Sequence, residues 1–489
     1  MANSNKKAQM RFVIIGAGMA GMLAAIKLKE NGYNNVTLYE KAGKVGGTWR
    51  ENTYPGLTCD VLSHAYTYSF EPNPDWTRVL PPGEEIQRYF EKTAEKYRIS
   101  AITRFNEEVE DCRYIGGKWQ LKTKSGIEDV ADVVIAATGV LHVPRYPDIP
   151  GMDSFEGDIF HTARWDHSVP LDGKRIGIVG TGSTGVQLVS ALSTRAAKLV
   201  HFQRSPQWVM PIENRPFTEE EIQAFRSDPA LLKYMQTEPN YVASVERFNN
   251  AIVNPDSEEM HEIEEIVRQN LETSVRDPAL REKLRPNYRA ACKRLIFSPD
   301  FYEAVQRPGV EVVVGGLQGI EKNGVRADNG ELYELDLIAL ATGFKADQFM
   351  RPMTITGRNG LTLEKAWESR PKAYMAISIP DFPNFFMLNG PGGPVGNFSL
   401  IDIAEQQWQY IAQLIELLAE EKCAEIAVKP EALEQFDRER IAAAKTTIFG
   451  SGCQSWYLDA EGVPATWPWT QARFREEMAA PKLEAYQLD

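Results

Sequence analysis

Cysteine and histidine are scarce in this chain, and their scarcity limits the chemistry to be expected. The 489 residues include 5 cysteines and 6 histidines. The cysteines are Cys59, Cys112, Cys292, Cys423 and Cys453, and none forms a Cys-x-x-Cys pair. This odd number and wide spacing predict neither a zinc site nor a disulfide framework. They are typical of a reducing compartment, so we expect a cytoplasmic protein without a bound metal.

Long apolar runs are also missing. No run reaches the roughly 18 residues of a membrane-spanning helix, and the short run at 12–15 is no signal-peptide core. The net charge is −13, from 54 basic and 67 acidic side chains, so we expect no binding to nucleic acid or to an anionic membrane. A hydrophobic content of 43% and a charged content of 25% instead predict a large globular enzyme of two or three domains.

The first glycine-rich motif lies between a predicted strand and a predicted helix. Residues 11–15 predict a buried strand, and residues 16–21 read Gly-Ala-Gly-Met-Ala-Gly. A helix is predicted over 19–28 and a second strand over 36–40. In this βαβ order the helix N-terminus offers free N–H groups to the pyrophosphate of a dinucleotide.

Each glycine of this motif has its own role. Gly16 permits the tight turn, Gly18 lets the backbone approach a pyrophosphate, and Gly21 allows the helix to pack closely on the strand. Glu40 ends the second strand, 19 positions after Gly21 (40 − 21). A carboxylate there accepts hydrogen bonds from ribose hydroxyls and repels a 2′-phosphate, so the motif predicts FAD or NAD and not NADP.

The same order of elements occurs a second time. Residues 175–179 predict a strand, 180–185 read Gly-Thr-Gly-Ser-Thr-Gly, 186–192 predict a helix and 198–202 a strand. The candidate phosphate-binding residues of this second motif are Gly180, Gly182, Ser183 and Gly185.

A basic residue takes the place that Glu40 has in the first motif. Arg204 lies 19 positions after Gly185 (204 − 185) and is followed by Ser205. A guanidinium there can pair with a 2′-phosphate, although a solvated surface arginine is the plain alternative. The sequence therefore predicts FAD at the first site and NADPH at the second, with a hydride passing between them.

A proline-rich connection separates the two motifs and divides the chain. We predict a first part of an FAD-binding domain over 1–145 and an NADPH-binding domain over 146–330, with a helical insert at about 215–290. Residues 331–489 then return to the FAD-binding domain and add a C-terminal substrate or lid region. The expected fold class is α/β, with two Rossmann-like dinucleotide-binding domains and a helical insertion.

A third motif directly precedes the second glycine motif. Residues 155–166 read FEGDIFHTARWD, with Phe155, Gly157, His161, Trp165 and Asp166 at the marked positions. This pattern resembles the signature of the Baeyer–Villiger monooxygenases, within the class-B flavin monooxygenases. The resemblance implies that the histidine coordinates domain movement. Taken alone, the histidine and the two aromatics could be ordinary core residues.

Other segments carry the same resemblance across nearly the whole chain. Gly47, Thr48 and Trp49 resemble the family's flavin-contacting loop. Asp60, in Cys-Asp-Val, resembles an aspartate near the flavin. Trp456 resembles the tryptophan that closes over nicotinamide and substrate. Both tryptophans could also be plain core or surface aromatics.

The sequence Cys-Lys-Arg at 292–294 resembles the segment that carries the family's active-site arginine. Arg294 is then the catalytic candidate, with Asp60 as its partner, and Lys293 is a second candidate for the NADPH phosphate. A turn-capping role for Asp60 and a helix-surface charge for Arg294 are the alternatives.

The resemblance implies a reaction that needs no side-chain nucleophile. NADPH reduces FAD, O2 gives a flavin C4a-peroxide, and that species adds to a small-molecule ketone to form an ester or lactone. A fixed guanidinium would keep the peroxide anionic and stabilise the substrate oxyanion. Two alternatives stay open: oxidation of sulfur or nitrogen on the same fold, and an NADPH-binding flavoprotein that acts as a redox sensor.

Overall fold

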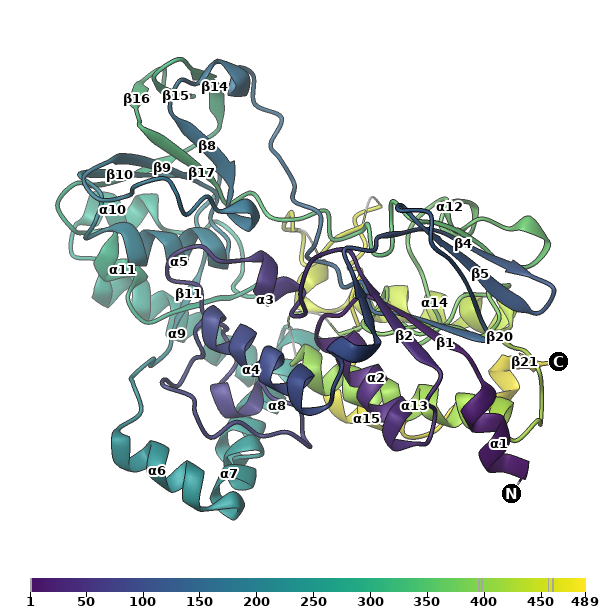
Figure 1. The fold of residues 1–489 in the computed structure, drawn as a ribbon. Helices are drawn as coiled ribbons and strands as arrows, with labels where there is room; N and C mark the ends of the chain where they lie inside the picture. Colours follow the sequence, from purple (N-terminus) through teal and green to yellow (C-terminus); the bar gives the residue numbers. More distant parts are fainter. Residues whose placement is uncertain (1, 395, 397–398, 456, 460) are drawn as a thin grey trace.

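Two parallel sheets organise the chain. The computed structural model describes residues 2–394, 396, 399–455, 457–459 and 461–489 (Figure 1). One five-stranded sheet has the order β19-β7-β1-β2-β3 and the other β13-β10-β9-β17-β8, and every pair in both is parallel. Parallel sheets are covered on both faces, which explains why these strands are continuous apolar runs.

The first sheet contains β1 (Phe12–Ile15), β2 (Val36–Glu40), β3 (Thr103–Phe105), β7 (Val133–Ala136) and β19 (Phe385–Met387). In β1, Phe12 and Ile14 face the helices α2 (Met19–Glu30) and α13 (Leu400–Ala419). Val13 and Ile15 face the opposite core cluster, under a smaller sheet. That sheet is formed by β18 (Thr354–Thr356), β4 (Val109–Ile115), β5 (Lys118–Thr123) and β6 (Glu128–Ala131).

The second sheet contains β8 (Asp158–His161), β9 (Arg175–Val179), β10 (Lys198–Gln203), β13 (Val310–Val314) and β17 (Leu337–Leu340). One face is covered by α5 (Ser183–Leu192) and α11 (Phe301–Ala304). The other face carries the antiparallel strands β14 (Leu317–Glu321), β15 (Gly324–Ala327) and β16 (Leu332–Glu334). Each predicted βαβ unit is therefore present.

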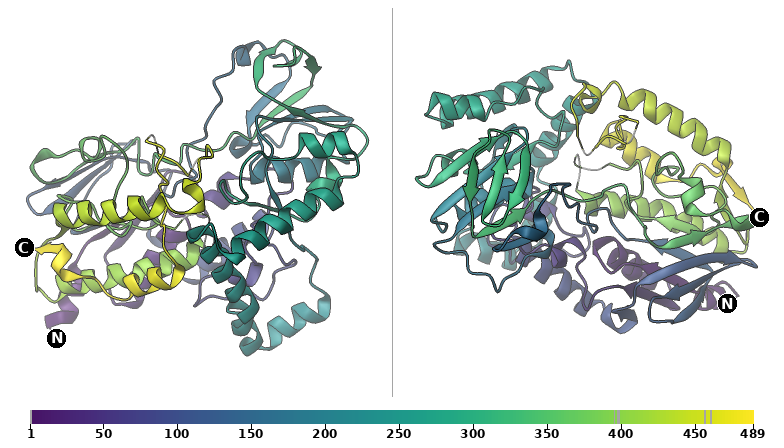
Figure 2. Two further views of the ribbon diagram at one scale, coloured as in Figure 1. Left: turned by 180° about the vertical axis from the view of Figure 1, so that it is seen from behind. Right: turned by 90° about the horizontal axis from the view of Figure 1, so that it is seen from above.

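The predicted helical insertion is confirmed as five helices, seen from behind in Figure 2. They are α6 (Glu219–Ser227), α7 (Pro229–Gln236), α8 (Pro239–Val253), α9 (Glu258–Ser274) and α10 (Pro278–Lys283). Side-chain caps explain where they begin: Thr218 and Glu221 form a capping box on α6, and Asp228 caps α7.

The remaining elements are short or lie at the periphery. They are α1 (Ala2–Gln9), α3 (Thr48–Glu51), α4 (Gly83–Lys96), α12 (Leu363–Ala366), α14 (Pro430–Ala444), α15 (Gln471–Ala479), β11 (Val209–Pro211), β12 (Ile296–Ser298), β20 (Ile426–Val428) and β21 (Tyr486–Leu488). Within the described ranges, no helix is both long and apolar enough to span a bilayer.

The chain crosses between the two sheets twice, and the two crossings pair with each other. Arg145 N donates to Gly343 O at 2.9 Å, and Lys345 N donates to Val143 O at 2.9 Å. The paired crossings lie after β7 and β17, at the ends of strands from both sheets. The two halves are therefore joined by a pair of adjacent, hydrogen-bonded segments.

Candidate active site

A large cleft lies between the two sheets. Its volume is about 2080 Å³, and both glycine motifs and helices α8 and α9 contribute to its described walls, together with Gln454, Ser455 and Tyr457 near the C-terminus. Pockets for one small ligand are usually about 300–1,000 Å³, so this cleft has room for two dinucleotides and a substrate. Among the described residues, no cluster of histidine, cysteine and carboxylate side chains suits a metal ion.

The first glycine motif presents bare backbone to this cleft. A β-carbon on Gly16 would lie 2.6 Å from Ala137 O, and one on Gly21 would lie 1.9 Å from Gly16 O. Gly18 faces Gly47 so closely that a β-carbon on Gly47 would lie 3.1 Å from Gly18 Cα. Gly16 and Gly21 are thus required by the tight turn and by the packing of α2 on β1. Gly18, Gly47 and Thr48 line the cleft near the N-terminus of α2, where a pyrophosphate could bind.

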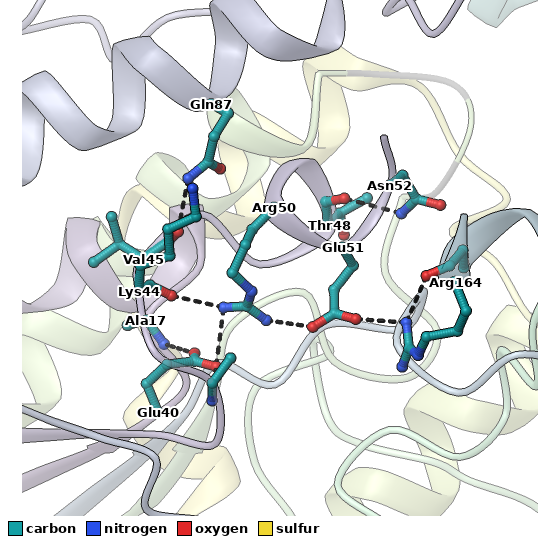
Figure 3. Close-up of polar contacts among 12 residues, drawn as sticks. Ala17, Glu40, Lys44, Val45, Thr48, Arg50, Glu51, Asn52, Gln87 and Arg164 are labelled. Carbon is teal, nitrogen blue, oxygen red and sulfur yellow. Dashed lines mark hydrogen bonds and ion pairs between the residues drawn. The ribbon is translucent and has the colours of Figure 1, made fainter. Parts of the chain in front are cut away.

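Glu40 is buried at the end of β2 and is held by the glycine turn. Its carboxylate accepts from Ala17 N at 2.8 Å, from Ala42 N at 2.9 Å and from Arg50 Nη1 at 3.0 Å (Figure 3). A carboxylate has about four acceptor positions, so one remains for a ribose hydroxyl. The geometry fits the adenosine end of FAD.

Arg50 was not identified from the sequence, yet it connects two motifs. It donates to Glu40 and, at 2.6 Å, to Glu51, which also accepts from Arg164 at 2.5 Å (Figure 3). Burial raises the pKa of Glu51, but Arg50 and Arg164 outweigh that effect and hold it below its usual range. These ion pairs connect the predicted flavin-contacting loop to Arg164 of the signature motif.

Trp49 lines the cleft in a fixed orientation. Its indole N–H donates to the Tyr66 hydroxyl at 3.0 Å, and the two rings meet edge to face at 5.5 Å. The ring therefore forms a rigid part of the wall where the predicted flavin loop lies.

The second motif repeats the geometry of the first. A β-carbon on Gly180 would lie 2.2 Å from Ala341 O, and one on Gly185 would lie 2.1 Å from Gly180 O. Gly182 has no atom within 4 Å of that position and faces open space, directly before Ser183 at the first turn of α5. The second dinucleotide can therefore approach the backbone here.

Two cations gather at the end of β10. Arg204 is exposed there, and Lys293 Nζ donates to Ser205 Oγ at 2.9 Å. Burial and the nearby charge of Arg204 both lower the pKa of Lys293. Two cations placed together with a serine hydroxyl are a suitable set of donors for a 2′-phosphate.

The signature motif lies where the chain crosses between the sheets. His161 is buried, its Nε2 lies 3.0 Å from Gly343 O, and its Nδ1 accepts from Ala163 N at 3.1 Å. Burial lowers the pKa of His161, so the ring is neutral and donates through Nε2. This histidine thus holds the second crossing.

The other signature residues support that position. A β-carbon on Gly157 would lie 2.5 Å from Asp336 O and 2.7 Å from the ring of Phe155. Trp165 is buried and packs edge to face on Phe160 at 4.9 Å. Asp166 accepts from Ser168 N at 2.8 Å and closes a turn.

Arg294 and Asp60 come together from segments 234 residues apart. Arg294 Nη2 lies 2.5 Å from Asp60 Oδ2, with side chains 30% and 18% exposed. The charge of Asp60 raises the pKa of Arg294, which therefore stays protonated. Both residues line the cleft.

Known proteins match the chain over almost its whole length. A family model described as pyridine nucleotide-disulphide oxidoreductase matches residues 10–229. An uncharacterized monooxygenase of Mycobacterium tuberculosis is 45% identical over 97% of this chain and 95% of its own. A Baeyer–Villiger monooxygenase of Streptomyces coelicolor is 36% identical over 98% of this chain and 92% of its own. The chain belongs to the Baeyer–Villiger monooxygenase family.

A solved structure agrees with this assignment. The cyclohexanone monooxygenase of Rhodococcus sp. Phi1 bound to NADP+ is 29% identical, with a TM-score of 0.85 over 98% of this chain and 99% of that one. The predicted family, the α/β fold class and the assignment as a flavin- and NADPH-dependent monooxygenase are thereby confirmed.

Sequence reasoning assigned no role to one residue of this monooxygenase's site, Tyr457. Tyr457 is buried, and its hydroxyl oxygen accepts a hydrogen bond from the Arg294 guanidinium. Gly396 makes room for both, because a β-carbon there would lie 1.8 Å from the tyrosine oxygen and 3.1 Å from Arg294 Nη1. The only available signal was its position beside Trp456, which lies outside the described residues.

Replacing Tyr457 by phenylalanine should lower the yield of ester per NADPH. The change removes one acceptor from a charged donor, an effect of about 1.5–3 kcal/mol, or roughly tenfold or more. We expect turnover to fall while KM for NADPH stays constant, because Arg204 and Lys293 are untouched. Steady-state kinetics with product quantification checks this, and an unchanged yield contradicts it.

The expectation of no disulfide is wrong for one pair. Cys292 and Cys453 are bonded across 161 residues, with their Cα atoms 6.1 Å apart. Cys59, Cys112 and Cys423 are free. Local spacing detects pairs that are close in sequence, and it gave no sign that folding brings these two segments together.

Proposed function

We propose that this monooxygenase uses NADPH, O2 and bound FAD to insert one oxygen atom next to the carbonyl of a ketone. The observation that carries the proposal is the partly buried Arg294–Asp60 pair in a cleft with two glycine-rich dinucleotide motifs. Bound FAD, once reduced by NADPH, supplies the activation of O2. The chain's own residues bind, orient and stabilise charge.

We assign the binding roles as follows. Gly16, Gly18, Gly21, Glu40, Gly47, Thr48 and Trp49 hold FAD on the first sheet. Gly180, Gly182, Ser183, Gly185, Arg204, Ser205 and Lys293 hold NADPH on the second, and Trp456 closes over the site. The signature residues Phe155, Gly157, His161, Trp165 and Asp166 act through the crossings and not on the substrate.

Arg294 is the catalytic residue of the proposal. Its guanidinium stays charged and keeps further N–H donors after binding Asp60 and Tyr457. Such fixed donors stabilise the negative charge that develops on the carbonyl oxygen during addition. Asp60 acts by fixing the orientation of the guanidinium.

An apolar ketone suits the remaining wall of the cleft. Its apolar side chains come mainly from the helical insertion and the C-terminal region: Tyr241, Val245, Phe248, Ile263 and Phe449.

The low cysteine content supports a cytoplasmic location. The single disulfide agrees with this location if it is exchangeable, as isolated disulfides in reducing compartments usually are.

A ketone panel tests the proposal against sulfur or nitrogen oxidation. Linear, cyclic, aryl and steroid ketones are offered beside a thioether, and NADPH consumption is followed together with product mass. We expect esters or lactones 16 Da heavier than at least one ketone class, since one oxygen atom is added. Sulfoxide alone favours heteroatom oxidation, and hydrogen peroxide alone favours the redox-sensor alternative.

A further inference from the structure

The Cys292–Cys453 disulfide joins the two segments that hold the catalytic arginine. Cys292 lies two positions before Arg294, and Cys453 lies four positions before Tyr457. Both cysteines belong to one apolar cluster with Leu295 and Phe449. The bond therefore lies directly behind the Arg294–Tyr457 contact.

The segment before Arg294 has an unfavourable backbone conformation. Ala291 has a φ of +59°, in the left-handed region that a residue with a β-carbon rarely adopts. Surrounding structure must hold such a residue in place, and the disulfide begins at the next position. Breaking the bond would remove one of the restraints on this segment.

A separate surface pocket opens onto the disulfide. Its volume is about 490 Å³, and both cysteines line it. The other lining residues are Pro286, Asn287, Tyr288, Arg289, Ser451 and Gly452. Arg289 supplies a partly exposed positive charge on the wall, paired with Glu264 at 2.7 Å. A second carboxylate, that of Asp256, lies 3.9 Å from Arg289. The pocket shares no lining residue with the cleft, so a small thiol can approach the disulfide without entering the cleft.

We propose that Cys292–Cys453 is a thiol-exchange site for a low-molecular-weight thiol that enters this pocket, and that the redox state of this pair controls how firmly Arg294 is held. Cys453 is 8% exposed and Cys292 1%, so Cys453 is the sulfur attacked. Isolated disulfides in reducing compartments are commonly sensors of this kind.

The exchange is balanced in atoms and electrons. The thiolate of the small molecule attacks Sγ of Cys453, the S–S bond breaks, and Cys292 leaves as a thiolate that takes up a proton. A second small thiol then attacks the mixed disulfide and releases Cys453 as a thiol. The protein gains two electrons, and the small molecule is oxidised to its own disulfide. Hydrogen peroxide reverses the change: one thiolate becomes a sulfenic acid, and the other displaces water from it.

Reduced glutathione is the probe for the holoenzyme. Before treatment we expect 3 free thiols on denaturation, matching the free cysteines, and all 5 afterwards, with a mass gain of about 2 Da. A mixed disulfide trapped at short times should lie on Cys453. A count of 3 thiols after treatment, or of 5 before it, overturns the exchange site.

The effect on catalysis rests on the role proposed for Arg294 and is measured separately. Reduction or Cys453→Ser should lower ester per NADPH about tenfold, because small displacements of a catalytic group are costly. Both should also speed proteolysis within 446–455. The matched control Cys423→Ser, at a free cysteine that lines neither the cleft nor the surface pocket, should leave the yield unchanged. The ester yield of the double variant Cys292→Ser/Cys453→Ser should not change when glutathione is added.

If reduction gives five free thiols but changes neither the ester yield nor the rate of proteolysis, the disulfide does not control how firmly Arg294 is held. If the oxidised protein forms no ester at all, the proposed function fails while the thiol count still decides the exchange.

Discussion

Arg294→Ala keeps FAD bound and continues to oxidise NADPH, but its ester formation falls about 100-fold or more. Arg294 belongs to neither glycine motif, so we expect cofactor binding and hydride transfer not to need this guanidinium. Loss of a fixed donor to a developing oxyanion costs about 10²–10³ in rate. The reducing equivalents should then leave as hydrogen peroxide, measured beside the ester.

Two further variants sharpen this result. Arg294→Lys retains a charge but loses the planar fork that binds Asp60 and Tyr457 together, so it should recover only part of the yield. Arg268→Ala removes an exposed arginine of α9 that pairs with Glu265, and neither residue lines the cleft, so it should leave ester per NADPH unchanged. A normal yield from Arg294→Ala would remove this residue from the mechanism.

Arg204→Ala raises KM for NADPH by about 10- to 100-fold and leaves KM for NADH nearly constant. The guanidinium at the end of β10 is expected to bind the 2′-phosphate, which NADH lacks. A hydrogen bond between charged groups contributes about 1.5–3 kcal/mol, which corresponds to this range. The ratio of the two KM values is the measurement.

Two further variants are compared with Arg204→Ala. Lys293→Ala should shift the ratio in the same direction, since Lys293 binds Ser205 beside Arg204. Arg195→Ala removes an exposed arginine that pairs with Asp172 and should change neither KM. An unchanged ratio in Arg204→Ala would show that this arginine does not recognise the phosphate.

Features encoded within one short stretch were predictable from the sequence. Each βαβ unit is contiguous, and the acidic Glu40 and the basic Arg204 stand at a fixed distance from their glycines. The helical insertion is likewise a continuous segment with its own caps. Local periodicity and spacing are sufficient for such features.

Contacts between distant segments were harder to foresee. The pairing of Asp60 with Arg294 was expected only through the family resemblance. The hydrogen bond of Tyr457 and the Cys292–Cys453 bond depend on how the C-terminal segment returns over residues 290–295. Arg50 was overlooked because an arginine after the glycine loop has no periodic or spacing signal of its own. The division of the chain into domains at 1–145, 146–330 and 331–489 stays a prediction. Strand β17 falls in the third of these ranges, and it pairs within the second sheet.

The origin of the oxygen in the product tests the central claim most directly. The holoenzyme is incubated with NADPH, an accepted ketone and ¹⁸O2, and the ester is examined by mass spectrometry. The account predicts one ¹⁸O atom per ester, at the inserted position, and one NADPH oxidised for each ester formed. NADPH oxidation that yields only labelled hydrogen peroxide with every ketone, or an ester without ¹⁸O, would contradict it.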